Sequence, residues 1–274
     1  MEVTPDLLAL QLFTGVALGA IYVLLAVGLS LIFGMLTVVN FAHGAFYMLG
    51  AYAGLAAIEK TGSFWLALIL APLAVAAFGM LCERWLIRPL YGRGIDYPLL
   101  LTFGLAYMMV EAVRMSFGRA GLPVDTPELL QGATSLGFAD FPTYRLFVIA
   151  VVALILLGLW LLIEKTSFGL IVRAGARDPV IVRVLGIDMS RVWLIVFGMG
   201  TGLAALAGVL SAPLQGVDPE MGTAVLTIAF VVTVVGGMGS LAGAIVAGLT
   251  IGVVESMVAL FFPEAAKVSM FVIM

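Results

Sequence analysis

The stretch LLALQLFTGVALGAIYVLLAVGLSLIF, residues 7–33, carries no charged side chain. A helix needs about 20 mainly apolar residues to cross the hydrocarbon core of a bilayer. This stretch is longer than that and contains Gly15, Gly19 and Gly28, with Gly34 just beyond it. We therefore expect a membrane-spanning helix that is tilted, or is broken near Gly34.

The rest of the chain is similarly apolar. Of its 274 residues, 63% are hydrophobic and 11% are charged, whereas soluble domains are about half apolar and about a quarter charged. A water-soluble fold could not bury so much apolar surface, so lipid is the expected solvent. Seven further apolar runs follow the first, at 41–58, 64–82, 97–117, 144–163, 192–214, 223–235 and 241–262. The sequence predicts one all-α domain over 1–274, a polytopic membrane bundle of about eight transmembrane helices.

The two ends of the chain carry weaker signals. The run 268–274 is apolar but reaches only about one-third of the length of a span, so we expect a further, truncated C-terminal helix there. The first six residues are acidic and lack a positively charged region, so no cleavable signal peptide is predicted.

Basic residues predict the orientation in the membrane. They gather in two loops that fall on the same side of an eight-helix bundle: Arg84, Arg88 and Arg93 in one, and Lys165, Arg173, Arg177, Arg183 and Arg191 in the other. The opposite loops are mainly acidic. By the positive-inside rule, the loop 164–191 is cytoplasmic and the amino terminus is external.

Composition excludes several kinds of function. The net charge of −3 gives no basic patch for nucleic acid. With only Cys82 and His43 as sulfur and imidazole ligands, no metal site is predicted. The chain has no Gly-x-x-x-x-Gly-Lys-Ser/Thr loop, so we expect it to bind neither ATP by that route nor any other cofactor.

The cytoplasmic loop contains the stretch RAGARDPVIVRVLGI, residues 173–187. Asp178 is a favourable N-cap, Pro179 suits the first helical position, and Gly186 is a natural stop. We expect a helix of about two turns between Asp178 and Gly186.

One face of this short helix is apolar. Ile181, Val184 and Leu185 recur at helical spacing, whereas Arg183 points elsewhere. Such a helix could rest on lipid headgroups. We favour docking into a groove of a cytoplasmic partner, because Arg173 and Arg177 place basic groups beside the apolar stripe.

Three stretches of the chain resemble segments of known transport proteins. The loop is similar to the coupling-helix segment of ABC importer permeases, although the full EAA pattern of other importer families is not present. The stretch VNFAHGAFYMLGAY, residues 39–52, resembles the signature of the branched-chain amino acid permeases, and VGGMGSLAGA, residues 235–244, resembles their Gly-rich turn. The resemblance covers about residues 14–262 and is closer to the shorter, LivH-like subunit.

The resemblance implies a non-enzymatic permease subunit of an ATP-driven importer for leucine, isoleucine or valine in the bacterial inner membrane. The implied partners are a second, LivM-like permease, two cytoplasmic ATPases that carry ATP and Mg²⁺, and an external solute-binding protein. Urea, short amides or other small polar solutes are the alternative within the family. An ion-coupled carrier or an intramembrane enzyme is a more distant alternative, because each would need several paired polar groups at depth.

Asn40 and His43 form a polar pair at the start of the second apolar run. Polar groups at membrane depth are costly without partners. In one interpretation Asn40 caps a helix and His43 lies at the cytoplasmic interface; in the other, both belong to a cytoplasmic gate. Tyr47, four residues after His43, would share its face.

The eighth apolar run contains a lone carboxylate, Glu255. It either belongs to the translocation pathway or pairs with a neighbouring helix. Gly236, Gly237 and Gly239 predict either a tight reversal or an interrupted helix, whose free backbone groups could bind the head of an amino acid.

Two further patterns are read as structural. Glu111 and Arg114 lie three residues apart, which predicts an intrahelical ion pair with no role in transport. Glycines spaced four apart predict close helix packing. They are Gly15 and Gly19, Gly50 and Gly54, Gly198 and Gly202, Gly239 and Gly243, and Gly248 and Gly252.

Overall fold

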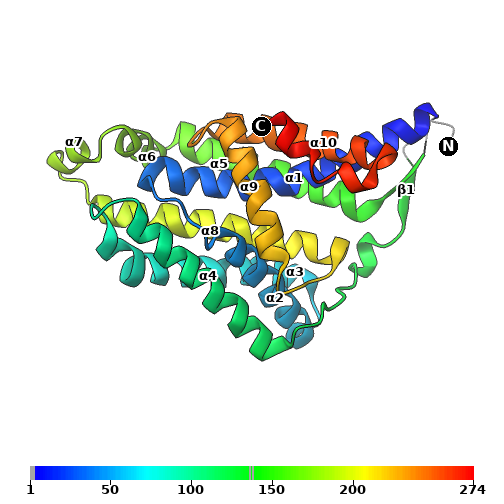
Figure 1. The fold of residues 1–274 in the computed structure, drawn as a ribbon, viewed down its shortest axis with the longest axis horizontal. Helices are drawn as coiled ribbons and strands as arrows, with labels where there is room; N and C mark the ends of the chain where they lie inside the picture. Colours follow the sequence, from blue (N-terminus) through cyan, green and yellow to red (C-terminus); the bar gives the residue numbers. More distant parts are fainter. Residues whose placement is uncertain (1–3, 136, 138) are drawn as a thin grey trace.

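A computed structural model describes residues 4–135, 137 and 139–274, and it is a bundle of long helices (Figure 1). The long helices are α1 (Pro5–Leu36), α2 (His43–Thr61), α3 (Phe64–Cys82), α4 (Asp96–Phe117), α5 (Thr143–Lys165), α8 (Met189–Gln215), α9 (Met221–Gly236) and α10 (Leu241–Phe261). The cytoplasmic loop predicted at 164–191 contains α6 (Ser167–Arg177) and α7 (Pro179–Val184). The all-α prediction is confirmed.

Short elements join the long helices. They are the π-helix η1 (Glu83–Ile87), the 3₁₀ helices η2 (Arg88–Leu90), η3 (Glu128–Leu130) and η4 (Pro263–Ala265), the antiparallel strands β1 (Ala133–Ser135) and β2 (Asp140–Pro142), and α11 (Ser269–Ile273). The strands lie at the same end of the molecule as the amino terminus, whereas α6 and α7 lie at the opposite end (Figure 1).

Each of the eight apolar runs coincides with one of the eight long helices, except that the run 41–58 begins two residues before α2 and the run 241–262 ends one residue after α10. Within the described residues, six of these helices are long and apolar enough to cross a membrane. The other two are α9, which is shorter, and α2, which carries His43, Glu59 and Lys60. A multi-pass membrane protein is therefore established, and the count of eight spans stays a prediction for α2 and α9.

The first helix, α1, forms the centre of the bundle. It is 32 residues long and almost wholly buried between Ala17 and Ile32. It continues through Gly34 and ends at Leu36, so the break expected near Gly34 lies slightly further along. The stop occurs at Thr37, which adopts a left-handed conformation with φ 51° and donates its backbone N–H to the Phe33 carbonyl.

Small residues set the closest helix contacts. A Cβ placed on Gly252 of α10 would lie 2.4 Å from the Cα of Gly19 on α1, and one on Gly248 would lie 3.0 Å from the backbone N of Val23. Side chains other than hydrogen would force these two backbones apart. The packing role predicted for the glycines four apart is confirmed here, and Gly50 makes the same kind of contact with Ala205 of α8.

Candidate functional site

The connection between α1 and α2, residues 37–42, returns into the bundle instead of staying at its surface (Figure 1). His43, the first residue of α2, is completely buried, and its Nε2 lies 3.0 Å from the Leu25 carbonyl oxygen. Leu25 is about 17 Å from the end of α1 at Leu36, at 1.5 Å per residue. The expectation that His43 lies at the interface is wrong, because the connection carries it to the middle of α1.

Hydrogen bonds from α4 hold this returning connection in place. The backbone N–H of Phe41 donates to Thr102 Oγ1 at 3.1 Å, and the same hydroxyl lies 3.4 Å from the Val39 carbonyl. Asn40 Oδ1 accepts from the backbone N–H of Ala42 at 3.1 Å, so it holds the turn before α2, whose N-cap is Ala42 and not Asn40. The non-helical residues thus satisfy much of their backbone within the protein, as membrane depth requires.

A cavity of about 370 Å³ opens beside this connection, between α2, α4 and α9, and extends toward the C-terminal end of α4. Its walls are mostly apolar and aromatic, with an ion pair at one end. The lining residues are Phe41, Ala45, Phe103, Ala106, Tyr107, Val110, Arg114, Glu220, Gly222, Thr223 and Leu226. We call it the outer cavity.

A second cavity, of about 470 Å³, lies on the other side of the connection. It is lined by Thr37 and Val38 of the connection, by the segment 90–98, by Arg177 and Pro179 at the junction of α6 and α7, and by Trp193 of α8. We call it the inner cavity.

Three aromatic rings pack together at Phe41. The ring centroid of Phe41 is 6.3 Å from that of Phe103 on α4 and 5.3 Å from that of Phe230 on α9. Phe41 lines the outer cavity, whereas Thr37 and Val38 of the same connection line the inner one. We call Phe41, Phe103 and Phe230 the aromatic floor; Phe41 and Phe103 line the outer cavity, and Phe230 packs against Phe41.

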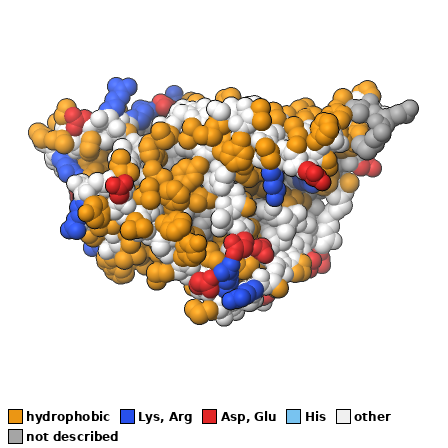
Figure 2. Space-filling model, viewed as in Figure 1, with side chains coloured by type: hydrophobic (Ala, Val, Ile, Leu, Met, Phe, Trp, Pro, Cys, Tyr) orange, Lys and Arg blue, Asp and Glu red, His pale blue; other side chains and the backbone are white. Residues whose placement is uncertain are grey.

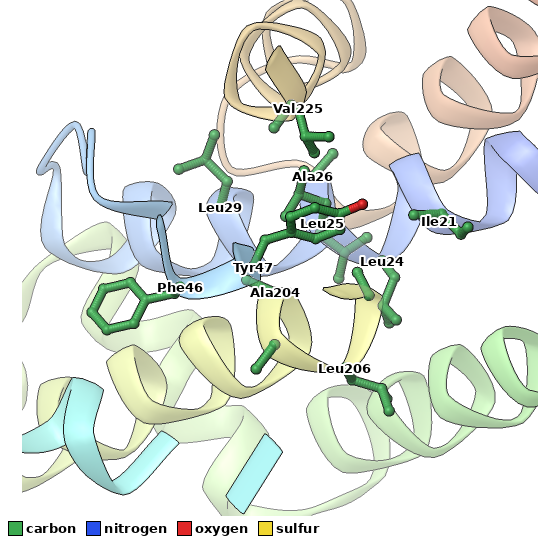
Figure 3. Close-up of a cluster of buried hydrophobic side chains, with 14 of the residues drawn as sticks. Ile21, Leu24, Leu25, Ala26, Leu29, Phe46, Tyr47, Ala204, Leu206 and Val225 are labelled. Atoms are coloured by element: carbon green, nitrogen blue, oxygen red, sulfur yellow. The ribbon is translucent and has the colours of Figure 1, made fainter. Parts of the chain in front are cut away.

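The other residues selected from the sequence for the pathway lie outside both cavities. Tyr47 is buried among side chains of α1 and α8 (Figure 3), and its hydroxyl donates to Ser211 Oγ at 2.6 Å and accepts from Gln215 Nε2 at 3.0 Å. Glu255 is 8% exposed, and its Oε2 accepts from the Tyr22 hydroxyl at 2.9 Å. The geometry thus favours a pairing role for Glu255 over a pathway role.

The glycine run after α9 forms a tight reversal. Gly237 and Gly239 have φ values of 87° and 86°, a conformation that favours glycine. Gly236 packs against Gly243 at the start of α10, and Gly239 packs against Gly34 of α1. These three glycines therefore serve close packing near the end of α1, and they line neither cavity.

The short helix predicted in the cytoplasmic loop is present as α7. Asp178 Oδ1 accepts from the backbone N–H groups of Val180 and Ile181 at 2.9 and 3.1 Å, which confirms the cap. Gly186 follows the helix with φ 84°. The apolar stripe is uncovered: Ile181, Val184 and Leu185 are 60%, 82% and 73% exposed.

The end of the molecule that carries α6 and α7 is basic. Figure 2 shows Lys and Arg side chains gathered there, beside a broad apolar belt. Arg173 of α6 forms an ion pair with Glu164, and Arg177 lines the inner cavity.

Side-chain contacts connect α7 to the inner cavity. The Arg183 guanidinium lies 4.7 Å from the centroid of the Trp193 ring, in cation–π geometry. Trp193 in turn contacts the ring of Tyr91 at 5.3 Å, and both rings line the inner cavity. A displacement of α7 would therefore move the wall of that cavity directly.

Tyr91 is anchored by a buried carboxylate. Its hydroxyl donates to Glu83 Oε1 at 3.1 Å, and Arg88 Nη2 lies 2.6 Å from Glu83 Oε2 and 2.9 Å from the Ser190 carbonyl oxygen. Burial and the neighbouring Glu83 carboxylate raise the pKa of Tyr91 well above its ordinary range. The phenol of Tyr91 therefore stays a neutral hydrogen-bond donor near neutral pH.

Sequence reasoning missed Thr102, the aromatic floor and the outer cavity. It assigned Arg114 to an intrahelical pair with Glu111, which is present, but Arg114 also forms an ion pair with Glu220. A face of α4 with residues at three- and four-residue spacing, Phe103, Tyr107, Val110 and Arg114, was the available signal. The partner Glu220 lies too far along the chain for spacing to reveal it.

Comparison with known proteins gives one family. The model for "Branched-chain amino acid transport system / permease component" matches residues 11–274. The permease BraD of Pseudomonas aeruginosa is 32% identical, over 94% of this chain and 88% of its own length. LivH of Salmonella typhimurium is also 32% identical, over 90% of this chain and 84% of its own.

Two more distant matches extend the comparison. The permease LivM of Escherichia coli is 29% identical, over 84% of this chain and 59% of its own length. The structure of PsaBC from Streptococcus pneumoniae in complex with Fab matches 98% of this chain and 88% of its own, with a TM-score of 0.52 and 14% identity. At that identity the likeness concerns the fold alone.

Proposed function

This chain belongs to the branched-chain amino acid transport permease family, and on that premise we propose that it is a permease subunit of an ATP-driven importer of leucine-like amino acids. BraD and LivH, which it matches over most of their length, are high-affinity branched-chain amino acid transport permeases. The chain is then a transport component and not an enzyme, and the ATP and Mg²⁺ are held by separate subunits.

The observation that carries the energy-coupling part of the proposal is the uncovered apolar stripe of α7 at the basic end of the molecule. Three apolar side chains exposed beyond half of their surface form the pattern by which a helix enters a groove of a partner. An ATPase that grips Ile181, Val184 and Leu185 would move Arg183, Trp193 and the wall of the inner cavity together.

The two cavities give the proposal its transport cycle. The solute enters the outer cavity and is stopped by the aromatic floor. ATP-driven movement of α7 then separates Phe41 from Phe103 and Phe230 and opens the outer cavity to the inner one. Two packings of similar free energy are needed for this step. The gate thus centres on Phe41. Asn40 and His43 hold the connection 37–42 in place. The packing of the surrounding helices is maintained by Tyr47, Glu255, Gly236, Gly237 and Gly239.

The proposed assembly contains a second, LivM-like permease, two ATPases on the cytoplasmic side and an external solute-binding protein. Similarity of this chain to both LivH and LivM supports a pair of related permeases. The basic residues near α6 and α7 support a cytoplasmic position for the loop 164–191, with the amino terminus outside the inner membrane.

Uptake by the reconstituted complex tests the solute and the energy source. Vesicles containing the full complex, with ATP on the ATPase side, should accumulate radiolabelled leucine against its gradient and should not accumulate urea. Vesicles without ATP, or with a non-hydrolysable analogue, are the control. ATP-driven accumulation of urea without leucine would replace the proposed solute, and accumulation driven by an ion gradient alone would overturn the importer.

A further inference from the structure

The outer cavity combines an apolar wall with one pair of opposite charges. Its lining includes the aromatic rings of Phe41 and Phe103, and Tyr107 contacts Phe103 edge to face with ring centroids 5.2 Å apart. At the external end of the cavity, Arg114 of α4 and Glu220 before α9 form an ion pair. A leucine-like amino acid has the matching chemistry, because it joins an aliphatic side chain to a carboxylate and an ammonium group.

One cation, Arg114, faces two carboxylates at the charged end of the outer cavity. Arg114 donates to both Glu111 and Glu220, so one guanidinium is shared by two carboxylates. The side chain of Arg114 is 27% exposed, whereas those of Glu111 and Glu220 are 50% and 61% exposed. The Arg114 guanidinium has five N–H donors and can donate to a further carboxylate. Because two carboxylates share this one cation, the Glu220 carboxylate can also accept hydrogen bonds from an ammonium group.

We propose that the outer cavity binds the solute as a zwitterion, with the solute carboxylate on Arg114, its ammonium group on Glu220, and its aliphatic side chain along the apolar wall toward Tyr107 and Leu226. This inference rests on the proposed function and adds to it the side chains that recognise the solute. It assigns a role in transport to Arg114 and Glu220, whose ion pair could otherwise be purely structural.

The geometry also orients the solute. Phe103, Tyr107 and Arg114 lie along one face of α4, and Phe103 and Arg114 are about 17 Å apart along the helix axis at 1.5 Å per residue. The charged head therefore stays toward the outside while the side chain points to the aromatic floor. Phe103 and Tyr107 are 48% and 63% exposed, so the cavity has an open side that the second permease would complete.

Binding to the purified permease–ATPase complex in nanodiscs, without the solute-binding protein, tests the assignment. Radiolabelled leucine should bind saturably. Leucinamide, which lacks the carboxylate, and 4-methylpentanoate, which lacks the ammonium group, should compete about tenfold more weakly or worse, since charge-assisted hydrogen bonds are lost. Absence of saturable leucine binding to the wild-type complex would overturn the site.

Two single variants separate the charges. Arg114→Gln should remove the preference for leucine over leucinamide, and Glu220→Gln should remove the preference for leucine over 4-methylpentanoate. Arg114→Lys should restore part of the first preference. The exposed Arg119, which lies outside the cavity, gives the matched control Arg119→Gln, for which both preferences should stay unchanged.

A steric pair on α4 tests the cavity independently of charge. Ala106→Phe should block leucine binding, because Ala106 lines the cavity, whereas Ala112→Phe should not, because Ala112 is exposed elsewhere on the same helix. Basal ATP hydrolysis by each complex reports assembly, so loss of folding is recognised separately.

The outcomes distinguish this inference from the function on which it rests. If the wild-type complex accumulates leucine with ATP, and the Arg114→Gln, Glu220→Gln and Ala106→Phe complexes keep wild-type binding and preference, the ion pair only clamps α4 to the start of α9 and the inference is wrong. If the wild-type complex does not accumulate leucine at all, the proposed function fails with it.

Discussion

Thr102 is the residue on which the returning connection depends most directly. Its hydroxyl accepts the Phe41 backbone N–H and contacts the Val39 carbonyl, and its side chain is completely buried. A backbone N–H at membrane depth that loses its partner has no water to replace it. One hydroxyl on α4 therefore positions the ring that closes the outer cavity.

Replacing Thr102 by Val keeps the shape of the side chain and removes the hydroxyl. We expect a loss of about 1–3 kcal/mol of stability, because the Phe41 N–H is left without its acceptor. Phe41 should also become less well held, so leucine should leak through the complex without ATP. Thermal unfolding and passive leucine flux in vesicles measure the two effects.

The control for this change is Thr102→Ser, which retains the hydroxyl. It should keep wild-type stability, and its passive leucine flux without ATP should stay as low as in the wild type. Equal leak through the Val and Ser variants would show that the hydrogen bonds of Thr102 do not hold the gate.

At the scale of single helices, the contact between α1 and α10 has almost no space to spare. Gly252→Ala should lower the stability of the folded protein by about 1–3 kcal/mol, because the new methyl group meets the backbone of Gly19. Gly104→Ala on α4 is the matched control, since a Cβ there has open space around it. Detergent-solubilised yield and melting temperature measure the difference, and similar losses in both variants would contradict the packing argument.

The helix α7 has a different role, because Ile181, Val184 and Leu185 are mostly exposed, although Val182 packs into the core. The double change Ile181→Asp and Leu185→Asp should leave the protein inserted but reduce ATP-driven uptake by about tenfold or more, since charged groups would have to enter an apolar groove. Stimulation of ATP hydrolysis by the loaded binding protein should be lost as well.

A control for α7 exists on the opposite side of the membrane. Leu129 of η3 is 79% exposed, comparable with the residues of the stripe, and Leu129→Asp should leave coupling intact. Unchanged uptake in the α7 variant would remove this helix from the mechanism.

Helices and their ends were the features that the sequence predicted best. Apolar runs locate the long helices because length and hydropathy are local properties, and Asp178, Pro179 and Gly186 locate α7 because caps act over a few residues. The depth of His43 could not be predicted in this way. It depends on how the connection 37–42 returns between α1 and α4, which only the packing of distant helices determines.

In the candidate site, too, contacts between near neighbours in the sequence could be predicted, whereas contacts between distant segments could not. The Arg114–Glu111 pair follows from spacing, whereas Arg114–Glu220 joins α4 to the start of α9, which are far apart in the chain. The sequence analysis selected His43 and Glu255 as candidate pathway residues. In the structure, His43 bonds to the backbone and Glu255 bonds to Tyr22. The exposed aromatic face of α4 was the better guide to a cavity.

For the whole molecule, the account requires opposite ends with different roles. The small β-hairpin lies at the end of the molecule that carries the amino terminus, and the basic end holds the inner cavity and α7 (Figure 1). In the proposed assembly, the solute-binding protein delivers its solute at the first end and the ATPases act at the second. Transport in one direction follows from this asymmetry.

Orientation is therefore the claim on which the rest depends, and thiol labelling in intact cells measures it. Cys82 is buried and can be replaced by Ala, and single cysteines can then be placed at Leu129 and Val184, which are 79% and 82% exposed. A membrane-impermeant reagent should label Leu129→Cys from outside. It should label Val184→Cys only after permeabilisation, and less so when the ATPase subunits are bound. Labelling of Val184→Cys in sealed cells would contradict the account.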